Sequence, residues 1–220
     1  MTTPQPIESA YPSVMEYISQ RISAAENAID EVVCNPGHQN SWISCELATI
    51  QIRMICELIM LGSVLAHIQS GEELDDRKWR PKEAFGELDR VNSHPLPIPV
   101  ELIYDANGPG AHQANPVSKP LPLNAISKIY GICGDLLHIP TARRVMEAKR
   151  PSYDLDQLQR WLTGLKRIIV GHALMLPERR RVLLCTWSGL AGEVPKCVLL
   201  DAMGESTFDL SKLAEFDLLP

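Results

Sequence analysis

The stretch YGICGDLLH, residues 130–138, places polar side chains in an apolar setting where they can take part in chemistry. On a helix Asp135 and His138 are three residues apart and share a face, so the carboxylate can orient the imidazole of a general base or a ligand. Alternatively, His138 only ends its helix, where a partly charged imidazole is favourable. We predict His138 as a candidate catalytic residue and keep the structural alternative open.

A second polar grouping lies on the most apolar predicted helix, residues 41–70. Glu46, Arg53 and Glu57 fall within about 40° of one another on a helix, and Arg53 and Glu57 are an i,i+4 pair. This line is either the solvated edge of the helix or a buried ionic network, and such networks sometimes mark sites. We predict Arg53 and Glu57 as candidate binding residues.

Cys45, Cys56 and His67 share another face of the same helix and have the side chains of metal ligands. Each is 11 residues from the next, which is about 16.5 Å along a helix, whereas zinc ligands lie about 2 Å from one ion. We therefore predict that these residues pack in the core and that the protein has no metal site. The sequence also lacks the Walker, GxGxxG, HExxH, GxSxG and CxxC motifs, and we predict no cofactor.

In KRIIVGH, residues 166–172, Arg167 is followed after four residues by His172. This R-x4-H spacing in a helical setting resembles the motif of the HEPN superfamily. Those proteins are small helical bundles, and many are metal-independent ribonucleases of toxin or defence systems. The resemblance implies that Arg167 stabilises phosphate charge and that His172 transfers protons. The alternative is that His172, which lies on an apolar stripe, is a core histidine with structural partners.

Charge is divided unevenly along the chain. Residues 1–110 carry 7 basic and 16 acidic side chains, whereas residues 111–220 carry 14 basic and 11 acidic ones. Arg143 and Arg144 belong to the basic part, and we predict them as binding residues for a phosphate group. The same charges can instead attract the acidic half of the protein or of a second subunit. The net charge of -6 therefore does not choose between a nucleic acid and a protein partner.

Hydrophobic spacing predicts the elements that position these residues. Asp154 as N-cap, with Gln157 three residues later, predicts the start of a helix that continues to Leu176. Residues 92–122 are rich in proline, which excludes a continuous helix or a central strand and predicts a long loop. The predicted helices cover residues 13–33, 41–70, 81–91, 123–138 and 154–176. The helix 41–70 is apolar on nearly every side, which predicts that other elements surround it.

Two β-prone segments around LAGEVP predict a C-terminal β-hairpin. With Ala191 at its centre, Cys185 faces Cys197 and Arg181 faces Asp201.

The predicted fold is mainly α (α+β), a bundle of about five helices with that hairpin at its end. We predict a single domain over 1–220, made of a helical core 13–91, a Pro-rich loop 92–122, a helical segment 123–176 and the hairpin 181–203.

The opening MTTPQPIESAYPS has neither a basic nor an apolar region, so we expect no secretory signal, a cytoplasmic protein and reduced thiols. The longest uncharged stretch of the core helix, Leu58 to Gly71, has 14 residues, fewer than the roughly 20 of a membrane span. We expect no membrane association.

We hypothesise a non-enzymatic regulatory or protein-interaction protein, with a homo-oligomer or another protein as its partner. The alternative is a HEPN-like metal-independent ribonuclease with RNA as its partner. The sequence leaves open whether the protein is an enzyme.

Overall fold

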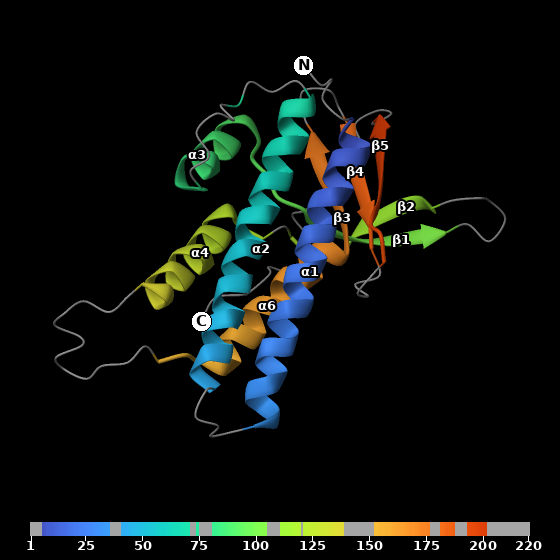
Figure 1. Cartoon of the computed structure of the whole chain (residues 1–220). Coiled ribbons are helices and arrows are strands. Elements are labelled where there is room, and N and C mark those ends of the chain that lie inside the picture. Colours follow the sequence, from blue (N-terminus) through green and yellow to red (C-terminus); the bar gives the residue numbers. More distant parts are fainter. Residues whose placement is uncertain are drawn as a thin grey trace, which may run out of the picture.

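The computed structural model describes residues 6–35, 41–70, 74, 81–104, 111–119, 121–138, 152–176, 181–187 and 193–201. These residues form a mainly α fold with a small antiparallel sheet, as predicted (Figure 1).

Two long helices, α1 (Ile7–Cys34) and α2 (Ser41–Ser70), form an antiparallel pair at the centre of the fold (Figure 1). A Cβ atom at Gly62 of α2 would lie 3.1 Å from the ring of Tyr11, so glycine permits the close approach of the two helices. α1 begins at Ile7 rather than at Ser13, and Pro12 lies inside it. Because Pro12 is near the N-terminus, it removes a single hydrogen bond of the helix, and the buried Ile7 and Tyr11 hold this part against the core.

Three further described helices pack around this pair: α3 (Pro81–Val91), α4 (Leu123–Leu137) and α6 (Leu155–Val170). In Figure 1, α3 and α4 lie on one side of α2, and α6 runs from the lower part of α2 across α1. The N-cap prediction for α6 is confirmed, because the Asp154 carboxylate accepts the N–H of Gln157 at 3.0 Å. Trp161, 1% exposed, anchors α6 in the core.

The sheet has five strands in the order β2-β1-β3-β4-β5, and all neighbours are antiparallel. The strands are β1 (Ile98–Tyr104), β2 (Ala111–Pro116), β3 (Gly171–Leu176), β4 (Arg181–Thr186) and β5 (Lys196–Asp201). β5 contacts α1 and β3 contacts α2, so the helix pair covers one face of the sheet.

The prediction that residues 92–122 form a loop is wrong. β1 and β2 lie in this segment, and β1 is inside the sheet, between β2 and β3. Pro99 is tolerated because only its carbonyl is used, as the acceptor of the Val117 N–H at 3.0 Å. Pro116 ends the edge strand β2, where a missing N–H costs little. Proline therefore restricted the positions of the strands without excluding them.

The predicted helix 154–176 is two elements. α6 ends at Val170, and Gly171–Leu176 is the buried strand β3. The apolar spacing fitted a helix, but residues buried on both faces of a sheet give the same composition. A Cβ atom at Gly171 would lie 3.0 Å from the Val100 carbonyl oxygen, so glycine allows β1 to pair beside the start of β3.

The predicted hairpin register is confirmed. In the pairing of β4 with β5, Cys185 is opposite Cys197 and Arg181 is opposite Asp201. The predicted end of the hairpin at residues 202–203 lies outside the described residues.

Candidate functional site

His172 lies in β3 and is fully buried, together with Tyr11 of α1. The Tyr11 hydroxyl donates to His172 Nε2 at 2.8 Å, and His172 Nδ1 donates to the Ile169 carbonyl at 3.0 Å. Both ring nitrogens therefore have partners, and the tautomer is fixed. Burial lowers the pKa of His172 to about 4, so the ring is neutral at pH 7. These contacts give His172 a structural role that joins α1, α6 and the sheet.

Arg167 is on the last turn of α6 and is exposed. The expected helical setting of the R-x4-H motif is wrong for His172, because the helix ends two residues before it. The exposed guanidinium and the fully buried imidazole do not share an accessible surface, which phosphate chemistry by the pair would need.

His138 is exposed just after the last turn of α4, and its N–H donates to the Gly134 carbonyl at 3.1 Å. Asp135 is exposed on the same helix. This position agrees with the helix-end alternative, and the described contacts do not connect His138 to His172. The predicted binding residues Arg143 and Arg144 lie outside the described residues.

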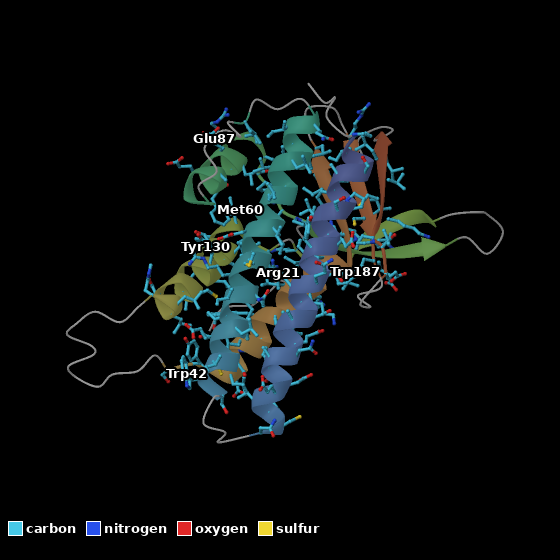
Figure 2. All side chains as sticks on the ribbon, in the orientation of Figure 1. Arg21, Trp42, Met60, Glu87, Tyr130 and Trp187 are labelled. Atoms are coloured by element: carbon cyan, nitrogen blue, oxygen red, sulfur yellow. The ribbon has the colours of Figure 1, made fainter. Side chains whose placement is uncertain are left out.

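Arg53 joins α2 to α4, and Glu57 pairs with it on α2. Arg53 Nη2 donates to the Tyr130 hydroxyl at 2.8 Å, and its Cζ is 4.6 Å from the centre of the Tyr130 ring. Arg53 Nε is 3.5 Å from Glu57 Oε1, and both side chains are about one third exposed. Figure 2 shows Tyr130 between α4 and α2. The cluster is thus neither a solvated edge nor a buried network, and one side of it is open to solvent.

His67 is buried and has polar partners on other elements. Its Nδ1 donates to the Ser63 carbonyl at 2.7 Å, and Asn92 Nδ2 donates both to His67 Nε2 and to the Met175 carbonyl, each at 2.9 Å. This network ties α2 to the segment after α3 and to β3. Within the described ranges, no group of three His, Cys, Asp or Glu side chains could hold a metal ion.

A cleft of about 890 Å³ lies between α3, the segment after it and the first turn of α4. Asp89, His94 and Lys119 supply its charged or titratable groups, and Phe85 and Leu121 are among its apolar lining. The site residues predicted from the sequence that the structure describes do not line this cleft.

A line of apolar side chains on α2 is partly exposed. We name it the α2 seam, and it consists of Ile43, Leu47, Ile50, Met54, Leu58, Leu61 and Leu65. At 100° per residue, these positions fall within about 80° of one another. Ile43, Leu47, Ile50 and Leu61 are 38–45% exposed, and the other three are partly exposed. Exposed apolar residues are common singly, whereas several in line along one helix face make that face a candidate interaction surface.

The neighbours of α2 explain why this face is open. α1 and α4 flank it, through the hydrogen bond from Arg21 to Gln51 at 3.1 Å and the contact of Arg53 with Tyr130. Figure 2 shows Arg21 between α1 and α2. The prediction that other elements surround α2 is therefore wrong for this face. The spacing of the seam residues could not show this in advance, because the buried residues of α2 follow the same 3–4 spacing.

By length and composition, α2 is the one described helix that could cross a membrane, but 61% of its most apolar window is buried inside the protein. A core helix shows the same properties.

No family model matches the chain, and neither a curated protein nor a solved structure is significantly similar to it. The HEPN resemblance therefore stays a prediction from the residues at 166–172. The class that the fold and surface define is a mainly α protein with a five-stranded antiparallel sheet and an apolar seam on its central helix.

Proposed function

We propose that this protein is a non-enzymatic protein-interaction protein that forms a homodimer through the α2 seam. The observation that supports the proposal is the apolar line from Ile43 to Leu65, in which four residues are 38–45% exposed and Leu58 and Leu65 also pack against the core. Buried apolar surface drives most protein association, and an isologous contact uses the same patch on both subunits.

The spacing of the seam residues indicates that the partner is a second copy of this chain. The steps between successive seam residues are 4, 3, 4, 4, 3 and 4, which read the same in both directions from Met54. Two antiparallel copies related by a two-fold axis beside Met54 therefore bring apolar residues together in every layer. In this arrangement Ile43 faces Leu65 of the second copy, Leu47 faces Leu61, and Met54 faces itself. The seam repeats after 11 residues, so its direction drifts by only about 20° per repeat, which corresponds to a slight right-handed supercoil of the pair.

The charged residues beside the seam also support a second copy of the chain as the partner. Arg53 and Glu57 lie on one flank of the seam, four residues apart, and each is about one third exposed. In the antiparallel dimer, Glu57 of one subunit lies near Arg53 of the other, so the pair is self-complementary across the axis. Such rim charges orient the partners more than they strengthen binding.

The register is tested by cysteine cross-linking, with Cys34→Ser as background because Cys34 is the exposed native thiol. We expect Met54→Cys to form a covalent dimer on mild oxidation. Ile43→Cys is expected to cross-link with Leu65→Cys in a mixture of the two variants, but not with itself. Cross-linking of Ile43→Cys with itself would indicate a parallel pair and contradict the register.

Self-association itself is measured by sedimentation across a range of concentrations. A 24.5 kDa monomer throughout the micromolar range would overturn the homodimer. If the monomer instead binds another protein and Leu47→Glu abolishes that binding, the seam is an interface for that other protein. The homodimer is refuted in this case too.

A further inference from the structure

Cys185 of β4 and Cys197 of β5 are direct partners across the antiparallel ladder, and both thiols are free. On the other side of β4, the Trp187 N–H donates to the Val170 carbonyl at 3.0 Å. Backbone polar groups of alternate residues in a strand point to the same neighbour, so those of Cys185 also point toward β3 and away from β5. Cys185 and Cys197 are therefore a non-hydrogen-bonded pair.

This kind of pair has the geometry of a disulfide. The Cα atoms of non-hydrogen-bonded partners are about 4.5 Å apart, and disulfides form over Cα separations of about 4.4–6.8 Å. The two strands therefore need little displacement for the bond to form.

Both thiols point to the inner face of the sheet. Leu183, Cys185 and Trp187 are buried, whereas the residues between them are partly exposed. On β5, Cys197 and Leu199 are partly buried against the core. The hydrogen bond with Cys197, followed by burial, raises the pKa of the Cys185 thiol well above its ordinary value. Cys185 therefore keeps its proton, and the partly exposed Cys197 is the sulfur that an external reagent reaches first.

We propose that Cys185 and Cys197 are a redox modification site that takes a low-molecular-weight disulfide, such as glutathione disulfide, as its oxidant. The Cys197 sulfur attacks one sulfur of glutathione disulfide, which forms a mixed disulfide and releases one glutathione. The Cys185 thiol then gives up its proton as its sulfur attacks the Cys197 sulfur, which forms the intrachain disulfide and releases the second glutathione. Two protein thiols are oxidised, one glutathione disulfide is reduced to two thiols, and the protein's two thiol protons leave with them.

The bond changes the stability of the sheet edge. β5 is an edge strand that packs on α1, and the disulfide would join it covalently to β4. The closed loop runs only from Cys185 to Cys197, and loop closure of this size limits the unfolded chain. We expect oxidation to raise the midpoint of thermal unfolding by about 6–12 °C. In a reducing compartment such a bond is transient, which suits a sensor.

The experiment uses the full chain, treated with glutathione disulfide or with dithiothreitol, alkylated and digested with trypsin. After oxidation we expect mass spectrometry to find the peptides 182–196 and 197–212 joined through Cys185 and Cys197, and the thermal midpoint to rise. Dithiothreitol should reverse both changes. Cys197→Ala should lose both responses, whereas the control Cys34→Ala, at the exposed thiol, should keep them.

Two results would overturn the proposal. One is a stable glutathione adduct on Cys197 with Cys185 still alkylated. The other is oxidation confined to Cys34. Both are read from the wild-type protein, so the test does not depend on how well Cys197→Ala folds.

Discussion

Replacing Leu47 by alanine should weaken the proposed homodimer without unfolding the subunit. Leu47 is 43% exposed in the single subunit. Burying a whole leucine side chain is worth about 1.5–3 kcal/mol, so covering the exposed part of Leu47 contributes about 0.6–1.3 kcal/mol. The residue occurs once in each subunit, so the dimer loses about 1.3–2.6 kcal/mol, and the dissociation constant rises about 10- to 80-fold.

Sedimentation equilibrium of the wild type and of Leu47→Ala measures this change. The subunit itself should keep its stability within about 0.5 kcal/mol, because the substitution is at an exposed helical position and alanine is a good helix former. Thermal unfolding at protein concentrations below the dissociation constant of the dimer measures the stability of the single subunit.

Val198→Ala is the matched control, because Val198 is a 52% exposed apolar residue of β5, away from the seam. Its dissociation constant should equal that of the wild type. An unchanged dissociation constant for Leu47→Ala would refute the seam, and a weakened Val198→Ala dimer would place the interface on the sheet instead.

Two further predictions concern stability. Burial lowers the pKa of His172 to about 4, below the ordinary value of 6.5, so the unfolded chain binds a proton that the folded chain rejects. Stability is therefore full above pH 6.5 and falls with pH down to about 4; at pH 5 denaturant unfolding should show a loss of about 2 kcal/mol, largely absent in His172→Gln. Gly171→Ala should cost about 1–3 kcal/mol, because its Cβ would meet the Val100 carbonyl oxygen at 3.0 Å. Gly131→Ala, where a Cβ meets nothing within 4 Å, should be neutral or stabilising, and equal melting of the two variants would contradict the close-approach argument.

The sequence pattern predicted a feature correctly where that feature depends on residues close together in the chain. The N-cap at Asp154, the central position of α2 and the opposition of Cys185 and Cys197 all follow from spacing over a few residues. The same local reasoning placed His172 on a helix, because apolar residues in a strand covered on both faces resemble those of a buried helix segment.

The α2 seam could not be predicted from the sequence, for a different reason. From composition α2 is apolar on nearly all sides, and no local pattern states which side its neighbours leave open. The seam exists because α1 and α4 pack on either side of it, as the contacts of Gln51 with Arg21 and of Arg53 with Tyr130 show.

The sequence by itself thus determined the helical class, the central helix, the hairpin register and the absence of a metal-ligand spacing at Cys45, Cys56 and His67. Only the tertiary structure decided that the proline-rich segment supplies two strands, that His172 is held neutral by Tyr11 and Ile169, and that one face of α2 stays exposed. The physical reason is that these outcomes depend on contacts between residues far apart in the chain, which spacing along the sequence does not encode.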